Sequence, residues 1–455
     1  MAEAATDDRE PLERLRELLA AGDQAALRDF LTALPHASDV ADLLEQLDEA
    51  DRLRVLVALT DEPELAAEAL AEMEPEEHPE DSLAALHPEQ IAAVMAELSD
   101  DDAADIVAEM DPEDQDRVLA SLSGEEAGEI RDLMRYDEES AGGIMTTELV
   151  AVPASLSAAQ AIDEVRRQAQ EVGDFYVVFV VDEGRHLLGW LPLPNLVTAD
   201  PSTSIDALVE PPVAAVLPDM DQEEVGRVVA RYNLTVVPVV DEEGVLLGGV
   251  TFDDVIDVIE AETTEDILKL GGTSQEEEIR GGWLDAVRSR LPWLCVNLVT
   301  ATFGATVVYL FRETIDRLAM LAVIMPVVAG MGGNSGTQAL AVTVRRLALT
   351  GGDAGRDRWG IVGKELLVGL GNGLVIGLIV AGVALVLQGD PRLGVVVMLA
   401  MWMNLTVGSF AGAFVPIVLE RLGVDPAIAS SMFVTAFTDM CGFLLLLGMA
   451  TQLLL

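Results

Sequence analysis

The sequence has few of the residues that bind soft metals or cross-link a small domain. It contains two cysteines and four histidines in 455 residues. Cys295 and Cys441 lie in separate apolar segments, so no disulfide framework is indicated. The histidines all precede residue 187, which leaves the apolar C-terminal part with carboxylate, amide and carbonyl oxygens as metal ligands. Such ligands suit Mg²⁺, Ca²⁺ or Mn²⁺ better than softer ions.

Basic residues are also scarce, with 27 Lys and Arg against 79 Asp and Glu. Lysine occurs only at Lys269 and Lys364. Residues 273–455 carry 13 acids and 12 bases, which leaves 66 acids and 15 bases in residues 1–272. Such an acid excess repels nucleic acid and anionic lipid and concentrates cations. Solubility in a saline habitat and cation sensing both remain open as explanations.

Residues 1–135 predict an acidic, all-α domain. Helix-start signals recur roughly every dozen residues, each before Leu, Ile, Val or Met at helical spacing. These signals are Pro88-Glu89, Asp100-Asp101, Pro112-Glu113 and Gly124-Glu125. Their spacing indicates a helical superhelix. The acidic N-terminus does not have the pattern of a secretion signal.

An internal repeat follows. Residues 176–182 and 187–189 match 234–241 and 246–248, and the pairs Asp182/Asp241 and Gly189/Gly248 are both offset by 59 residues. Each unit predicts an apolar strand, a turn, a second strand and a helix. The repeat resembles a tandem pair of α/β CBS modules, which we assign to residues 136–203 and 204–253. The resemblance implies either an adenine nucleotide site or a scaffold that binds none.

A connecting helix and linker, residues 254–282, lead to an apolar domain at 283–455. Five segments are long enough to cross about 30 Å of hydrocarbon: 291–311, 318–348, 364–387, 393–419 and 426–455. Basic residues are concentrated on one side, which is typical of a cytosolic face. They are Arg280, Arg288, Arg290, Arg345, Arg346, Arg356, Arg358, Lys364 and Arg421, against Arg312, Arg317 and Arg392 on the other side. We expect the protein to lie in the cytoplasmic (inner) membrane, with its N-terminal half in the cytosol and its C-terminus outside.

Asp439 is the strongest candidate ligand in the apolar domain. An acid at membrane depth is costly and typical of an ion pathway. Thr435 and Thr438 lie within one helical turn of it. Asp425 lies 14 residues earlier and near the same helical face, which predicts an acid at the mouth of the pathway.

The run Gly330–Gln338 is rich in glycine and amides and predicts an irregular break that lines a pore with Asn334. Close packing of small residues is the alternative. Asn372 and Asn404 add amides in the third and fourth segments.

These features together resemble the MgtE family of magnesium channels and transporters, from about Asp100 to the C-terminus. The motifs that carry the resemblance are Ala141-Gly142-Gly143-Ile144-Met145-Thr146, Val250-Thr251-Phe252-Asp253-Asp254-Val255, Glu260-Ala261-Glu262-Thr263-Thr264-Glu265-Asp266, Gly332-Gly333-Asn334-Ser335-Gly336-Thr337-Gln338, Leu422-Gly423-Val424-Asp425-Pro426-Ala427 and Asp439.

The resemblance implies a homodimer whose axial pore binds hydrated Mg²⁺ at Asp439, and a plug helix between the CBS pair and the pore. It also implies regulatory Mg²⁺ sites between acidic cytosolic domains. The matching positions are Asp101, Asp105, Asp221, Glu223, Asp254, Glu262, Glu265, Asp266 and Asp425. Thr337 and Asn233 depart from the family pattern, and Asn233 puts the number of regulatory ions in doubt.

The predicted fold is therefore multidomain, with an all-α N-terminal helical superhelix, an α/β tandem CBS pair, a connecting plug helix and a five-span α-helical membrane domain. The predicted function is the import of Mg²⁺ down its electrochemical gradient. Intracellular Mg²⁺ is expected to close the pathway by bridging acids that otherwise repel one another. No phosphate-binding loop or catalytic triad is apparent, which argues against an enzyme. The alternatives are a transporter of Mn²⁺ or Co²⁺, and a membrane-anchored CBS sensor that conducts nothing; channel and slower carrier both remain open.

Overall fold

The computed structural model describes residues 9–455 apart from 125, 171, 173, 174, 176, 272, 274–282, 351–357 and 423. The chain divides into two compact units, Met1–Ile259 and Glu260–Leu455. We describe each unit by itself.

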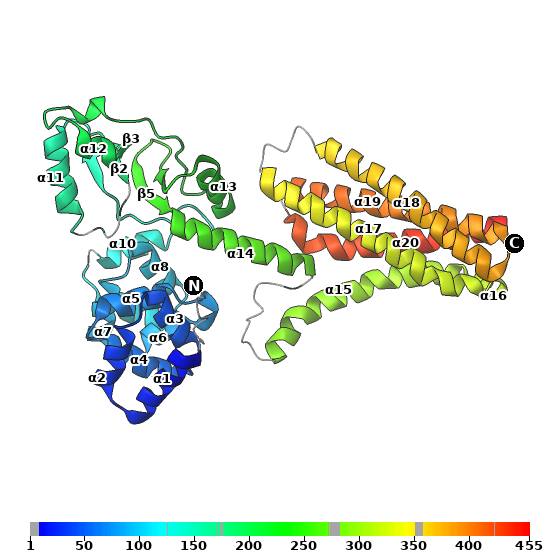
Figure 1. Ribbon diagram of the computed structural model, residues 1–455, viewed down its shortest axis with the longest axis horizontal. Coiled ribbons are helices and arrows are strands. Elements are labelled where there is room, and N and C mark those ends of the chain that lie inside the picture. Colours follow the sequence, from blue (N-terminus) through cyan, green and yellow to red (C-terminus); the bar gives the residue numbers. More distant parts are fainter. Residues whose placement is uncertain are drawn as a thin grey trace, which may run out of the picture. The chain divides into compact units, whose positions relative to one another are not determined.

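The first unit begins with a stack of short helices, coloured blue to cyan in Figure 1. Acids and prolines start several of them, as the sequence predicts: the Ser99 side chain caps α8, and Pro88 and Pro112 open α7 and α9. The helices are α1 (Arg9–Ala21), α2 (Gln24–Leu31), α3 (Ala37–Glu45), α4 (Glu49–Leu59), α5 (Pro63–Ala71), a 3₁₀ turn (Pro75–Glu77), α6 (Pro79–Ala84), α7 (Pro88–Met95), α8 (Asp100–Ala108), α9 (Pro112–Ser121) and α10 (Glu126–Leu133).

Two α/β modules follow in the same unit. The first has β1 parallel to β2 and β2 antiparallel to β3, and the second pairs β4 antiparallel to β5. Their elements are β1 (Ala151–Pro153), α11 (Ala158–Gln168), β2 (Val177–Val181), β3 (Leu187–Pro192), α12 (Leu193–Thr198), a 3₁₀ turn (Ile205–Ala207), α13 (Gln222–Tyr232), β4 (Val236–Val240) and β5 (Leu246–Thr251). Both strand pairs keep the predicted offset of 59 residues, which confirms the internal repeat.

The helical stack and the second module share one hydrophobic core. That core runs from Leu15 in α1 to Val250 and Val255 at the end of the module, whereas the first module has a core of its own. A small cluster that includes Phe179 and Val236 joins the two modules. The shared core fixes α8 relative to the start of α14, where the acidic residues of interest lie.

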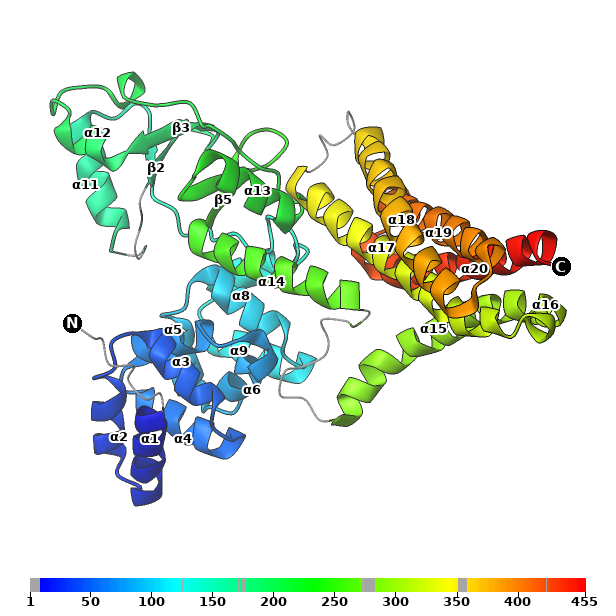
Figure 2. The same cartoon turned by 45° about the vertical axis from the view of Figure 1, so that its right-hand side comes forward.

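The long helix α14 (Phe252–Gly271) runs from the last strand into the second unit. The other helices of that unit are α15 (Trp283–Leu310), α16 (Arg312–Arg317), α17 (Met320–Thr350), α18 (Arg358–Gln388), α19 (Pro391–Arg421) and α20 (Pro426–Leu453). Among the described residues, α15, α17, α18, α19 and α20 are long and apolar enough to cross a membrane. Figure 2 shows α17 to α20 packed as a bundle. The predicted fold class is confirmed.

The predicted break in the second span is wrong, because α17 is helical without interruption from Met320 to Thr350. The reason is close helix packing. The side chain of Asn404 in α19 is fully buried against Gly332, and its Nδ2 donates a 2.9 Å hydrogen bond to the Val328 carbonyl oxygen. The carbonyl oxygen of Gly332 in turn faces Gly408. Glycine therefore serves here to let helix backbones approach rather than to interrupt a helix.

This packing yields a matched pair of substitutions. Gly408→Ala would push a Cβ into the carbonyl oxygen of Gly332, whereas a Cβ at Gly330 meets nothing within 4 Å. We expect Gly408→Ala to destabilise the protein by about 1–3 kcal/mol and Gly330→Ala to be neutral or slightly stabilising. Thermal unfolding of the detergent-solubilised chain measures both. Equal melting temperatures for the two variants would contradict this packing.

Candidate metal sites

Three of the predicted regulatory acids meet inside the first unit. Asp101 and Asp105 lie on α8, and Asp254 lies in the first turn of α14. Asp101 is 8% exposed, and its Oδ1 atom is buried with no hydrogen-bond partner among the described residues. The charge of Asp254 acts on both α8 residues. The cluster thus offers one buried carboxylate oxygen, Oδ1 of Asp101, that the described residues leave unsatisfied.

Burial and like charges raise the pKa values of these three acids. Burial is the main cause of the raised pKa of Asp101, followed by the charges of Asp102 and Asp254. Desolvation by the surrounding protein, then the charge of Asp102, raises the pKa of Asp105 to about 7, although Asp105 itself is exposed at the surface. Burial raises the pKa of Asp254 to about 6 against a hydrogen bond from Thr251, which lowers it. A divalent cation would relieve the repulsion that these shifts reflect.

The two neighbours of Asp101 have partners of their own. The Asp100 carboxylate accepts hydrogen bonds from the Thr146 hydroxyl (2.6 Å) and from the Thr147 backbone N–H (3.0 Å) and hydroxyl. The Ser99 hydroxyl donates to Asp102 at 2.6 Å. Asp100 therefore ties α8 to the start of the first module and has less capacity left for an ion. The sequence does not distinguish these acids, because the partners of Asp100 lie about fifty residues away.

Glu148 is an acid that sequence reasoning missed. Burial, then the charges of Asp100 and Glu129, raises the pKa of Glu148 to about 7. It lies directly after the two threonines that hold Asp100. In the sequence, only the position of Glu148 directly after Thr146-Thr147 could have indicated a role, and such a position is a weak signal.

Asp221 and Glu223 have local partners at the start of α13. The Asp221 Oδ1 atom accepts a 2.9 Å hydrogen bond from the Glu223 N–H and so caps α13. The Glu223 carboxylate pairs with Arg227. No described contact joins either residue to the α8–α14 cluster.

The later acids of α14 lie in the second unit. Glu262 and Asp266 are half-buried and have partners of their own. Glu265 pairs with Lys269, whose Nζ also lies 2.7 Å from Oδ2 of Asp425. The structure thus brings Glu265 and Asp425 together through a lysine that the sequence did not single out as part of the site.

Asp439 lies half-buried on α20, beside Gly304 of α15. Thr438 is fully buried, and its hydroxyl donates a 2.9 Å hydrogen bond to the Thr435 carbonyl oxygen. That bond leaves the Thr438 hydroxyl oxygen able to accept but not to donate elsewhere. Asp439 and both threonines therefore form one polar segment of α20.

Asn334 belongs to a different place within the chain. It lines a cavity of about 330 Å³ between α17, α18 and α19 with Ser335, Gln338 and Asn372. The described lining includes neither Asp439 nor the two threonines of α20. Gly333, which precedes Asn334, faces the side chains of Thr435 and Thr438, and no described contact joins Asn334 itself to Asp439.

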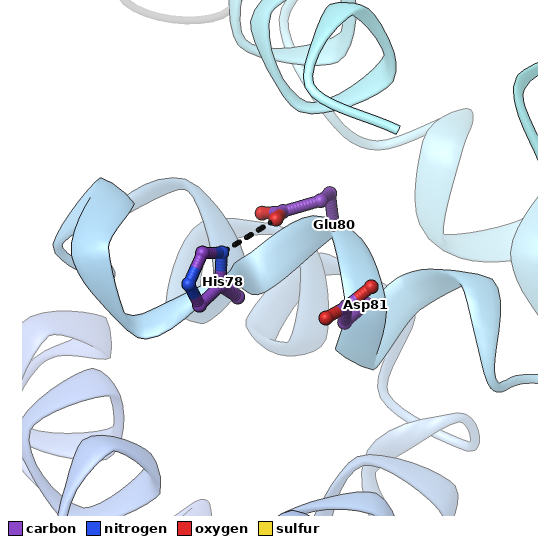
Figure 3. Close-up of side chains that lie close together, drawn as sticks. All are labelled: His78, Glu80 and Asp81. Atoms are coloured by element: carbon purple, nitrogen blue, oxygen red, sulfur yellow. Dashed lines mark hydrogen bonds and ion pairs between the residues drawn. The ribbon is translucent and has the colours of Figure 1, made fainter. Parts of the chain in front are cut away.

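A further group, His78, Glu80 and Asp81, has ligand atoms within 4.8 Å of one another (Figure 3). His78 Nδ1 lies 2.9 Å from Glu80 Oε1. All three residues belong to the start of α6, a helix of six residues. Nothing else among the described residues points to a ligand there, and we assign it no ion.

An acidic helical domain, a CBS pair and, among the described residues, five helices apolar enough to cross a membrane define a class, that of membrane proteins with an acidic CBS-containing domain. Family models match in three parts: the MgtE intracellular N domain at residues 35–139, CBS domains at 141–202 and 191–261, and the MgtE divalent cation transporter at 325–449. The chain belongs to the MgtE family, which is a family of transporters and not of enzymes.

Relatives match over nearly the whole chain. The magnesium transporter MgtE of Thermus thermophilus is 37% identical over 97% of this chain and 98% of its own length. That of Bacillus subtilis is 31% identical over 93% and 94%. A crystal structure of the cytosolic domain of the Mg²⁺ channel MgtE with ATP is 40% identical, with a TM-score of 0.51 over 54% of this chain and 99% of that chain.

The raised pKa values predict a pH-dependent stability for the metal-free protein. Asp105 and Asp254 hold protons in the folded state up to about pH 7 and about pH 6, above the ordinary value of 3.8. The folded state binds more protons than the unfolded chain between these limits, so their contribution to the free energy of unfolding falls as pH rises from about 4 to 7. Thermal unfolding in a chelator should give a flatter pH dependence for Asp105→Asn than for the unaltered chain. Identical slopes would contradict the assignment.

Asp100 and Asp101 should respond in opposite ways to the same substitution. Asp101→Asn removes a repelling charge, so we expect the metal-free chain to gain up to about 1 kcal/mol and its stabilisation by a divalent cation to shrink. Asp100→Asn weakens charged hydrogen bonds to Thr146 and Thr147 and should cost about 1–3 kcal/mol, with the cation response retained. Melting curves with chelator and with Mg²⁺ test both. A larger loss of cation response for Asp100→Asn would reverse the two assignments.

Proposed function

We propose that this chain forms a homodimeric, Mg²⁺-selective channel of the cytoplasmic membrane that closes when intracellular Mg²⁺ binds its acidic domains. The observation that carries the gate is the cluster of Asp101, Asp105 and Asp254, with a buried oxygen unpartnered among the described residues and with pKa values raised by burial and neighbouring acids. The name of the Thermus thermophilus relative, a magnesium transporter, supports the choice of ion.

The pathway is proposed at the dimer axis, with Asp439 as the central acid. Mg²⁺ dehydrates reluctantly and keeps several waters, so one carboxylate per subunit with the hydroxyls of Thr435 and Thr438 suits a hydrated ion. Asn334 is proposed to contribute from α17, where the preceding Gly333 faces Thr435 and Thr438. Permeation follows the electrochemical gradient, because the chain shows no phosphate-binding loop.

The gate is proposed to be electrostatic. Without a cation, the acids of α8 and α14 repel one another in surroundings that screen them poorly. A divalent cation that bridges them favours the packing in which they are close, and α14 transmits this change to the membrane helices. Asp221, Glu223, Glu262 and Asp266 are proposed as further regulatory ligands, and so are Glu265 and Asp425 when Lys269 does not occupy them.

The N-terminal half is proposed to lie on the cytosolic side of the membrane and the C-terminus on the outer side. Arg345, Arg346, Arg358 and Lys364 lie at the ends of α17 and α18 that are proposed to be cytosolic, whereas Arg312 and Arg317 lie at the opposite end. An odd number of spans then places the two termini on opposite sides.

An adenine nucleotide is a second proposed ligand. A relative's cytosolic domain was crystallised with ATP, and this chain has a matching CBS pair. The nucleotide would act as a regulator at the CBS modules, separate from the transported ion.

Uptake into liposomes tests the pathway. Asp439→Asn keeps the size of the side chain and removes its charge, so we expect Mg²⁺ uptake to fall about tenfold or more. Glu313→Gln removes a charge at an exposed site on α16 and should leave uptake unchanged. Uptake that survives Asp439→Asn would move the pathway elsewhere, and Mn²⁺ carried as fast as Mg²⁺ would contradict the proposed selectivity.

The same liposomes test the gate. High Mg²⁺ on the cytosolic side should stop uptake by the unaltered chain, and a combined Asp101→Asn, Asp105→Asn and Asp254→Asn variant should lose this inhibition. Inhibition that is unchanged in the triple variant would refute the proposed gate while leaving the pathway intact.

A further inference from the structure

Lys269 occupies an unusual place for one of only two lysines in the chain. It lies in the last turn of α14. Its Nζ is 2.7 Å from Oδ2 of Asp425 at the start of α20 and also pairs with Glu265 one turn earlier. All three side chains are half-buried, with exposures of 17% for Lys269, 21% for Glu265 and 30% for Asp425.

The ammonium keeps its charge in this position. Burial lowers the pKa of Lys269, but hydrogen bonds and charges of Asp425 and Glu265 outweigh it, so that the pKa lies above its ordinary value. A half-buried ammonium between two carboxylates satisfies oxygens that would otherwise repel each other.

The residue after Lys269 makes an apolar contact with the same bundle. Leu270 packs against Leu340 and Val344 of α17, which are 0% and 4% exposed. The end of α14 is thus held to α20 by an ion pair and to α17 by apolar packing. These two helices carry Asp439 and Asn334.

We infer that Lys269 is a built-in cation that holds the end of α14 against the bundle when no metal ion is bound there. The ammonium occupies the two carboxylates that a divalent cation would need, and it cannot diffuse away because it is part of the chain. A tethered group competes at a high effective concentration. This contact therefore forms without free Mg²⁺. The α8–α14 cluster differs, because the charges described as acting on its acids are those of other acids.

The consequence for transport rests on the proposed gate. If α14 controls the pore, Lys269 makes closure easier and lowers the Mg²⁺ concentration that achieves it. The contact itself can be tested without any transport measurement.

Hydrogen–deuterium exchange of the full chain in detergent with a chelator tests the contact. In Lys269→Gln, Glu265 and Asp425 repel, and we expect amide protection of residues 260–271 to fall about tenfold. Addition of Mg²⁺ should restore protection, because the freed carboxylates can then bind the ion. Lys269→Arg keeps the charge and should stay protected.

Lys364→Gln is the matched control. Lys364 is 57% exposed and lies 3.8 Å from Glu365, so this variant makes the same charge change without breaking a close pair. If Lys269→Gln stays protected in chelator, or if Lys364→Gln loses as much protection, the inference is wrong. The double variant Lys269→Gln/Asp425→Asn removes the repulsion as well and should recover part of the protection, which separates a broken ion pair from a misfolded protein.

In liposomes with low cytosolic Mg²⁺, Lys269→Gln should then take up Mg²⁺ faster and require more Mg²⁺ to close. A loss of amide protection without a change in uptake would keep the contact but separate it from the gate. An unchanged response of the triple α8–α14 variant would instead refute the proposed function alone.

Discussion

Repulsion between carboxylates that apolar packing forces together is the constraint on which the cytosolic part depends. The helical stack and the second CBS module share one core, and that core brings Asp101 and Asp105 of α8 next to Asp254 of α14. Burial of like charges opposes this packing, and protons or cations relieve it. An arrangement of like charges that costs stability without a bound cation is one whose packing a cation can control. The proposed regulation by Mg²⁺ depends on this property.

The membrane part is subject to a different constraint. Its helices pack closely while a few polar side chains remain within the spans. Gly332, Gly408 and the buried Asn404 let α17 and α19 approach backbone to backbone. Asn334 lines a cavity between α17, α18 and α19 whose described lining does not include Asp439. Lys269 links the end of α14 to α20, and the next residue, Leu270, packs it against α17. Charge thus acts twice, as unsatisfied acids at one end of α14 and as a satisfied ion pair at the other.

Local patterns predicted the fold well. The repeat offset between Val177 and Val236, the helix starts at Pro88 and Pro112, and the five apolar segments all depend on short stretches of sequence. The prediction was wrong for Gly330–Gln338, because glycine in a span has two uses, and only the neighbouring Asn404 decides between them. Within the site, the sequence pointed to Asp101 and Asp254, and the structure brings them together. It could not separate Asp100 from Asp101, nor indicate Glu148 or Lys269, since their partners lie far along the chain.

The central claim is that one set of bound cations both orders the α8–α14 cluster and closes the pore. The most direct measurement is a Mg²⁺ titration of the full chain reconstituted in vesicles. Two responses are recorded at each Mg²⁺ concentration: the amide protection of residues 100–109 and 252–259, and the uptake of Mg²⁺. We expect the two responses to share one midpoint and to shift together to higher Mg²⁺ in Asp101→Asn. Closure of the pore at a Mg²⁺ concentration that leaves these amides unprotected would contradict the claim.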